Sequence, residues 1–222
     1  MTNLMATQNL ESRLVVVGGV SLCVRGIRPD DEPALRAAFA QLSPSARYAR
    51  FRGVGTPSDA QWRYLADVDG ERHVAMVAID PAGEIVGVAR FVCGRELGQA
   101  EVAFTIADKL QRMGLGRILL ETLLPLARSR GVNTLVAYTS AENQGMVRLF
   151  LSRGGRHVST HQGEAVLTLP TASGTPPCGA TTTSRTSTTS RTRSTRWSFA
   201  RIAARARNSA RMAWRRAARS AA

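Results

Sequence analysis

Two hydrophobic periods run along the first 169 residues of the chain. Apolar residues that alternate with polar ones, or that form short continuous runs, predict strands, because successive side chains in a strand point to opposite faces. Turn residues bound these runs, and Pro81-Ala82-Gly83 between two of them predicts a hairpin. The expected strands are residues 20–27, 73–80, 84–93, 100–107, 133–140, 156–160 and 164–169.

Apolar residues that recur every three or four positions predict helices in the intervening segments. Asp30 or Asp31 can cap the first of these helices, and Pro33 suits its first turn. Ser43 caps the second, and Gly131 ends the longest. The expected helices lie within residues 28–43, 43–51, 58–68, 114–130 and 141–155.

The order of these elements predicts a mixed sheet. The three strands between residues 73 and 107 follow one another closely and form an antiparallel meander, and helix 114–130 then leads to strand 133–140. A strand–helix–strand connection of this length joins parallel strands. We therefore expect an α/β (α+β) fold over residues 20–169, with a mixed, mainly antiparallel central sheet flanked by helices, after a loose lead-in at residues 1–19.

The composition changes after Pro170. Residues 170–222 contain 11 arginines and no lysine, aspartate or glutamate, whereas residues 1–169 hold 19 basic and 16 acidic residues. Most of this tail is low-complexity sequence that buries too little apolar area to fold. Residues 197–219 have the pattern of a basic amphipathic helix, which suits nucleic acid or an anionic membrane surface. The competing interpretation is a functionless extension, because G/C-rich DNA translated out of frame has this composition.

Cysteine and hydropathy patterns exclude several classes of protein. Cys23, Cys93 and Cys178 lie far apart and have no Cys-x-x-Cys or Cys/His spacing, so we expect no bound metal and no disulfide framework. The apolar run at residues 14–24 is too short, and too interrupted by glycine, to span a bilayer. The chain also begins without the basic residues of a secretory signal. We therefore expect a soluble cytoplasmic protein.

The stretch QRMGLG at residues 111–116 opens the longest predicted helix. The first amides of a helix have no partner inside it and carry partial positive charge, so they bind phosphate. Gly114 and Gly116 leave the backbone uncovered, and Arg112 and Arg117 add charge. A Walker loop and a dinucleotide fingerprint both require residues that are missing here. The stretch predicts a phosphorylated ligand, and an ordinary helix start is the alternative.

Four segments, in order, resemble the GCN5-related N-acetyltransferase (GNAT) superfamily, and especially the acetyltransferase domain of bacterial protein-lysine acetyltransferases. The resemblance covers about residues 20–169. It implies an acyl-CoA N-acyltransferase that transfers an acetyl group from acetyl-CoA to a primary amine, either a small amine or a protein lysine, by direct attack in a ternary complex. The segments are IRPDDEPALRAAFAQLSPSARYARF (27–51), GEIVGVARFV (83–92), AEVAFTIADKLQRMGLGRILLETLLPLARSRG (100–131) and AENQGMVRLF (141–150).

The resemblance also implies roles for single residues. In the family, the motif amides hold the pyrophosphate of acetyl-CoA, the preceding strand bonds the pantetheine, and a helix asparagine contacts the cofactor. Glu101 resembles the glutamate that takes the proton from the amine, and a solvated strand carboxylate is the alternative. Asn143 has a helix-capping alternative. The implied cofactor-binding residues are Phe104, Thr105, Ile106, Gln111, Arg112, Met113, Gly114, Leu115, Gly116, Arg117 and Asn143.

Two positions depart from the family pattern. Phe150 stands where many members have a tyrosine that protonates the departing thiolate, and Gly155 stands where a phenylalanine is usual. We expect Gly155 to loosen the packing of the last two strands. These departures keep open a second interpretation, a non-catalytic acyl-CoA-binding sensor. A third is a nucleic-acid or membrane-surface binder that acts through the arginine-rich tail.

Overall fold

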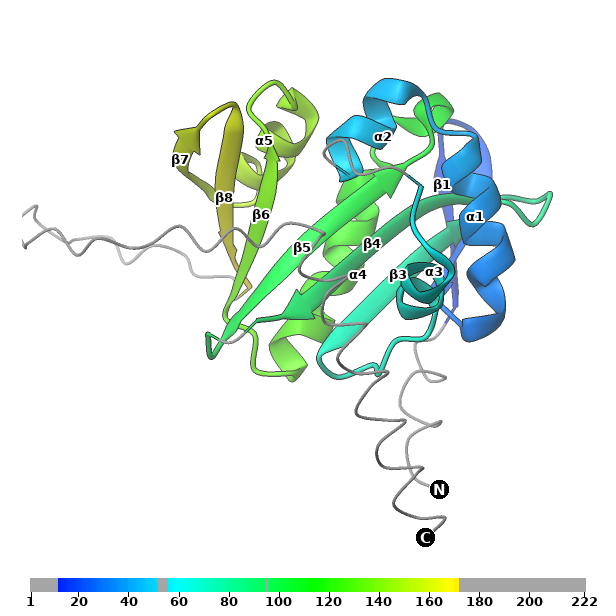
Figure 1. The fold of residues 1–222 in the computed structure, drawn as a ribbon, viewed down its shortest axis with the longest axis horizontal. Coiled ribbons are helices and arrows are strands. Elements are labelled where there is room, and N and C mark those ends of the chain that lie inside the picture. Colours follow the sequence, from blue (N-terminus) through cyan, green and yellow to red (C-terminus); the bar gives the residue numbers. More distant parts are fainter. Residues whose placement is uncertain (1–11, 52–55, 95, 172–222) are drawn as a thin grey trace, which may run out of the picture. The chain divides into compact units, whose positions relative to one another are not determined.

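The computed structural model describes residues 12–51, 56–94 and 96–171 (Figure 1). The helix predicted at 197–219 lies outside these residues. None of the described helices is long and apolar enough to cross a membrane. The strands are β1 (Arg13–Val17), β2 (Val20–Gly26), β3 (His73–Ile79), β4 (Ile85–Cys93), β5 (Gln99–Ile106), β6 (Thr134–Ser140), β7 (Arg156–His161) and β8 (Glu164–Pro170). The helices are α1 (Glu32–Ala40), α2 (Pro44–Phe51), α3 (Asp59–Ala66), α4 (Leu115–Ser129) and α5 (Gln144–Leu151), with 3-10 turns η1 (Pro29–Asp31) and η2 (Asp108–Leu110).

The strands form one sheet in the order β1-β2-β3-β4-β5-β6-β8-β7. Every neighbouring pair is antiparallel except β5 and β6, which are parallel. The predicted mixed, mainly antiparallel sheet is therefore confirmed. Helix α4 makes the crossover between the two parallel strands, as the strand–helix–strand pattern predicts.

Strands β5 and β6 pair only at their beginnings. Their register runs from Gln99 opposite Thr134 to Glu101 opposite Val136, and then stops. Beyond these three pairs β5 continues against β4, and β6 continues against β8, so the two strands part (Figure 1). We call this divergence, which begins after Glu101 and Val136, the β5–β6 fork.

Helices cover both faces of the sheet. Figure 1 shows α4 behind the sheet and α1 and α3 in front of it. On the α4 side, Leu119 and Leu123 are fully buried in one cluster with Phe91 and Val102, and each such side chain contributes about 1.5–3 kcal/mol by leaving water. On the other side, which we call the α1/α3 face, Ala103 and Thr105 of β5 line a small cavity under α1 and α3. The side chains of β5 therefore alternate between the two faces of the sheet.

The structure corrects the lead-in predicted for residues 1–19. Residues 13–17 form β1, which pairs with β2 along its whole length. Gly18 and Gly19 have φ values of +57° and +80°, and a two-residue type I′ hairpin turn requires positive φ at both positions. The glycine pair that interrupts the apolar run in the sequence is thus the turn between two strands.

Helix α5 is shorter than the predicted 141–155. It begins after Asn143, whose side-chain oxygen accepts from the Met146 amide at 3.1 Å, and Gly154 follows its end with φ of +79°. A Cβ on Gly155 would lie 2.7 Å from the Phe150 carbonyl oxygen and 2.8 Å from that of Thr168. The backbones of α5 and β8 therefore approach closely at Gly155, and the looser packing expected there is not what the structure shows.

The described fold is completed by Thr171. This residue is buried, its amide donates to the Asn133 carbonyl at 2.9 Å, and its hydroxyl donates to the Val132 carbonyl at 2.7 Å. We predict that deletion of residues 173–222 leaves the thermal midpoint nearly unchanged. Deletion of 171–222 should lower it by about 4–8 °C, because the two hydrogen bonds of Thr171 together contribute roughly 2 kcal/mol.

Differential scanning calorimetry of the full chain and the two truncated chains tests this prediction. A fall of several degrees on removal of 173–222 alone would contradict it, since the tail would then contribute to the folded domain.

Candidate active site

The loop between β5 and α4 ends in a row of amides without acceptors. Among the hydrogen bonds of the described residues, no acceptor takes the backbone N–H of any residue from 112 to 117. The first amide of α4 that is bonded is that of Ile118, to the Gly114 carbonyl at 3.1 Å. We call residues 112–117 the amide cluster. Their N–H groups and the helix dipole give this point the partial positive charge that the sequence predicts for an anion site.

Backbone conformation keeps the amide cluster open. Gly114 precedes the first residue of α4 with φ of +94°, which favours glycine. A Cβ on Gly114 would meet nothing within 4 Å, and one on Gly116 would meet only the Leu149 side chain at 3.7 Å. Arg112 also has a positive φ, +61°. An anion can therefore approach the cluster without meeting a side chain at Gly114.

The side chains of the motif behave differently from one another. Gln111 Nε2 donates to the Ile106 carbonyl and to Asp108 Oδ1, each at 3.2 Å, so this side chain braces the loop. Met113 packs against the β1–β2 turn at Gly18. Arg112 is exposed and is in none of the ion pairs formed by the described residues.

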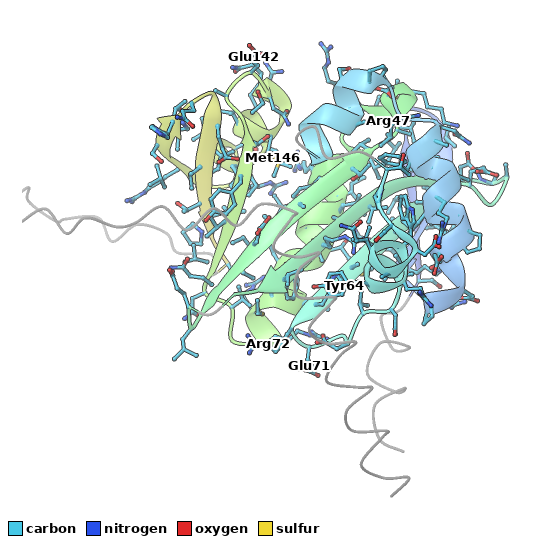
Figure 2. The ribbon with its side chains drawn as sticks, in the orientation of Figure 1. Arg47, Tyr64, Glu71, Arg72, Glu142 and Met146 are labelled. Carbon is cyan, nitrogen blue, oxygen red and sulfur yellow. The ribbon has the colours of Figure 1, made fainter. Side chains whose placement is uncertain are left out.

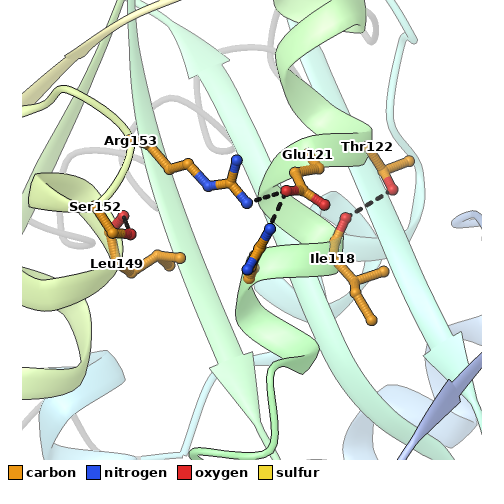
Figure 3. A network of polar contacts seen from close by, with 7 residues as sticks. Ile118, Glu121, Thr122, Leu149, Ser152 and Arg153 are labelled. Carbon is orange, nitrogen blue, oxygen red and sulfur yellow. Dashed lines mark hydrogen bonds and ion pairs between the residues drawn. The ribbon is translucent and has the colours of Figure 1, made fainter.

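Arg117 shares a carboxylate with a second arginine. Its Nε lies 3.1 Å from Glu121 Oε1, and Arg153 pairs with the same oxygen, a contact visible in Figure 3. The network ties α4 to the segment after α5. Exposed pairs of this kind contribute little stability, so the Arg117 guanidinium can exchange Glu121 for a ligand anion at small cost.

Strand β5 presents backbone groups to the fork. Just after β5, the Ala107 amide points toward β4, because it donates to the Val86 carbonyl. Just before β5, the Gly98 carbonyl points toward β6, because it accepts from the amides of Asn133 and Thr134. Since these directions alternate along a strand, the groups of Phe104 and Ile106 face the fork and those of Thr105 face β4.

Only some of the predicted pantetheine contacts therefore lie at the fork. The Ile106 carbonyl is occupied by Gln111, which leaves the Ile106 amide and both backbone groups of Phe104 for a ligand. Thr105 instead directs its side chain to the cavity on the α1/α3 face. A ligand in the fork would meet β5 at alternate residues.

Glu101 and Asn143 have different surroundings. Glu101 is the last β5 residue paired with β6, it lies on the α1/α3 face, and its Oε2 is shielded from solvent. The side-chain oxygen of Asn143 caps α5, and its Nδ2 donates to Thr139 Oγ1 at 3.0 Å. The capping alternative thus accounts for the contacts of Asn143, whereas Glu101 stands at the closed end of the fork.

Sequence reasoning missed Tyr138. It lies on β6 two residues beyond Val136, the partner of Glu101, and therefore on the same face as Glu101. Partial burial raises the pKa of the Tyr138 phenol above its usual value, and the carboxylates of Glu101, Glu96 and Glu164 raise it further. The signal was the alternation within 133–140, which sets Tyr138 opposite the apolar face. Phe150, in contrast, is fully buried in the core.

No group of three or more His, Cys, Asp or Glu side chains in the described part of the chain is arranged to hold a metal ion. Comparison with known proteins identifies the family to which this fold and this loop belong. The acetyltransferase (GNAT) family profile matches residues 37–154, more than half of the chain. The chain belongs to the GNAT acetyltransferase family. It is thus an acyl-CoA N-acyltransferase, as the sequence predicts.

Relatives of this GNAT protein include bacterial acetyltransferases. Acetyltransferase PA5475 of Pseudomonas aeruginosa is 34% identical over 140 residues, which are 61% of this chain and 75% of that protein. Acetyltransferase Pat of Mycolicibacterium smegmatis is 32% identical over 128 residues, 57% of this chain and 38% of Pat. The crystal structure of the GNAT domain of S. lividans PAT aligns with a TM-score of 0.66 at 25% identity, covering 72% of this chain and 96% of that domain. The resemblance to protein-lysine acetyltransferase domains is supported.

Substitution of Gly114 tests the amide cluster. We predict that Gly114→Asp weakens binding of coenzyme A at least tenfold, or about 1.4 kcal/mol, because a carboxylate beside the amides repels the pyrophosphate. Isothermal titration calorimetry measures the affinity. Gly131→Asp is the matched control, since Gly131 follows the other end of α4 with φ of +70° and also has nothing within 4 Å of its Cβ position. Equal affinity losses in both variants would remove the assignment.

Titration of Tyr138 tests its surroundings. The phenolate would form in a partly buried site beside carboxylates, so we predict a pKa above the ordinary value of about 10. Ultraviolet difference titration of the wild type against Tyr138→Phe isolates this residue. Glu101→Gln should move the pKa down, whereas Glu71→Gln should not, because Glu71 lies in the turn before β3 (Figure 2) and has no influence on Tyr138. A Tyr138 pKa that is the same in the wild type and in Glu101→Gln would contradict this placement.

Proposed function

We propose that this GNAT protein transfers an acetyl group from acetyl-CoA to a primary amine by direct attack while both substrates are bound. The observation that carries the proposal is the place of the amide cluster, which follows β5 after the short turn η2 and therefore lies toward the open end of the fork. A pyrophosphate on these amides leaves the pantetheine to follow the free edge of β5 toward Glu101. The phosphate oxygens of the ligand would then meet the N–H groups of the amide cluster. The amide groups of its pantetheine would meet the backbone groups of β5 that face the fork.

The reaction needs a base for the amine. An amine is protonated at neutral pH, and it attacks the thioester only after it loses that proton. We assign this step to Glu101, at the closed end of the fork. The free amine nitrogen then bonds to the acetyl carbon, and the Phe104 amide, which faces the fork, is the donor on β5 for the oxyanion that forms.

The nitrogen of the tetrahedral intermediate then loses its second proton to solvent. The carbon–sulfur bond breaks, and the thiolate of CoA takes up a proton from a donor group, which regains one from solvent. Phe150 has no acidic proton and is buried in the core. We assign the donor role to Tyr138, which shares the α1/α3 face with Glu101 and, as a phenol, is protonated at neutral pH. Tyr138→Phe should then lower turnover and leave coenzyme A affinity unchanged.

The charges around Tyr138 favour a cationic acceptor. Glu96, Glu101 and Glu164 all lie close enough to influence its ionisation, so their negative potential attracts an ammonium group and repels an acidic one. The resemblance to protein-lysine acetyltransferase domains supports a protein lysine as the acceptor. A small cationic amine satisfies the same electrostatics.

An acceptor screen tests the proposed activity. Purified protein, acetyl-CoA and lysine-containing peptides or small amines are mixed, and release of the CoA thiol is measured. We expect release that depends on the amine. A protein that binds coenzyme A but releases no thiol with any amine would instead be the acyl-CoA-binding sensor.

Substitution of Glu101 tests the base. Glu101→Gln should keep the fold and the acetyl-CoA affinity, because the side chain is similar in size and lies away from the amide cluster. Turnover should fall by about 10²- to 10⁴-fold, the usual contribution of a positioned base. The loss should shrink as the pH rises, because the amine then arrives deprotonated.

Steady-state rates over a range of pH measure this effect. Glu71→Gln is the control, since it removes a carboxylate in the turn before β3 that is not among the groups acting on Tyr138. Wild-type turnover of Glu101→Gln at neutral pH would exclude Glu101 as the base.

A further inference from the structure

One carboxylate joins the amide-cluster loop to helix α2. Asp108 lies in η2, between β5 and the amide cluster. Its Oδ2 accepts from the Ser43 amide at 2.9 Å, and its Oδ1 accepts from the Ser43 hydroxyl at 2.9 Å. Ser43 immediately precedes α2, and its hydroxyl also accepts from the Ala46 amide at 3.2 Å. Asp108 therefore holds the first turn of a helix that is 65 residues away in sequence.

The same carboxylate belongs to a chain of hydrogen bonds that starts at the fork. The Ile106 carbonyl, on the fork edge of β5, accepts from Gln111 Nε2 at 3.2 Å. Gln111 Nε2 also donates to Asp108 Oδ1 at 3.2 Å. Each residue in the series Ile106, Gln111, Asp108 and Ser43 is thus bonded to the next. The fork edge, the loop and α2 are one polar network.

Helix α2 lies against both strands of the fork. It contacts β5 and also β6, although these strands have parted from each other. Arg47 (labelled in Figure 2) connects α2 back to α1, because its guanidinium donates to the Ala40 carbonyl at 2.5 Å and lies 5.0 Å from the centre of the Phe39 ring. Helix α2 is therefore held from α1 on one side and from Asp108 on the other. The position of α2 therefore affects which acceptor molecules can approach the fork from the α1/α3 face.

The hydrogen bonds that Asp108 accepts from Ser43 are made to a charged carboxylate. The Ser43 amide, above all, lowers the pKa of the Asp108 carboxyl, so this group is ionised at neutral pH. Hydrogen bonds to a carboxylate are about twice as strong as those between neutral groups. Asp108 is nevertheless exposed, so the connection competes with water and depends on how firmly the loop holds the carboxylate.

We propose that Asp108 is a positioning residue that places α2 over the fork when a phosphate group occupies the amide cluster. The proposal rests on the proposed function, because it takes coenzyme A as the ligand of that cluster. Arg112 and Gly114 both have positive φ, and a phosphate bound to the amides between them restricts the loop. Because Gln111 is bonded to Asp108 and Asp108 to Ser43, the start of α2 is then restricted as well. The conformational population of α2 shifts toward the position in which it lies against both strands of the fork. The acceptor wall of the site is thus assembled by the cofactor.

Hydrogen–deuterium exchange with coenzyme A as the probe tests the proposal. In the wild type, saturating coenzyme A should slow exchange of the 112–118 amides, and it should also slow exchange of the α2 amides at 45–51 by about tenfold. In Asp108→Ala, protection of 112–118 should remain, and the protection of α2 should be lost. Asp108→Asn keeps the shape but not the charge, and it should retain only part of the effect.

Lys109→Ala is the matched control. Lys109 is the neighbouring residue of η2, but it pairs with Asp80 in the β3–β4 turn, at 3.4 Å, and not with α2. This variant should protect α2 as the wild type does. Ser43→Ala removes the hydroxyl that donates to Asp108 and also the acceptor of the Ala46 amide, so its α2 exchange is compared with and without coenzyme A. It should weaken the protection of α2 without changing coenzyme A affinity.

The outcomes separate the two proposals. If coenzyme A protects neither 112–118 nor α2 in the wild type, the proposed function fails and this inference fails with it. If it protects 112–118 but not α2, the function stands and the inference is wrong. If α2 is protected equally in the wild type, Asp108→Ala and Ser43→Ala, α2 responds to the ligand without Asp108, and the inference is also wrong.

Discussion

A parallel pairing of only three residues, between β5 and β6, places the site in this protein. Each of these strands is held by an antiparallel neighbour over seven residue pairs, β5 by β4 and β6 by β8. The parted ends therefore need no further pairing with each other to stay ordered. The unpaired edge of β5 has backbone groups that must find partners in water or in a ligand. The crossover that parallel strands require brings the start of α4 to the same end of the sheet.

The sequence predicted the fold well where the pattern is local. Strand alternation, glycine at a helix end and proline or serine at a helix start each depend on a few neighbouring residues, and those elements are where they were expected. The prediction was wrong at Gly18 and Gly19, because two glycines indicate a break as well as a hairpin turn. Which of the two forms depends on whether residues 13–17 find a partner strand, and here β2 is that partner. The prediction for Gly155 was wrong for a related reason, since the close approach of a β8 carbonyl to this position depends on the folded sheet.

The site was predictable to a different extent. Glycines and arginines at a helix start indicate free amides, and the structure contains them at 112–117. The fork could not be predicted, because the residue at which two strands part depends on the register of four strands. The use of Gln111 could not be predicted either, and the sequence could not decide between the two alternatives for Asn143. An amide side chain donates and accepts equally well, and only the folded neighbours decide whether it meets a ligand or its own backbone.

Gly155 has a mechanical consequence for the two walls of the fork. On the β6 side, the distance between α5 and β8 is fixed by backbone atoms in contact, where no side chain can be trimmed or rearranged. On the α2 side, the link is a single exposed carboxylate. One wall is therefore stiff and the other compliant. Acceptors of different bulk would therefore meet a fixed wall on the β6 side and a displaceable wall at α2.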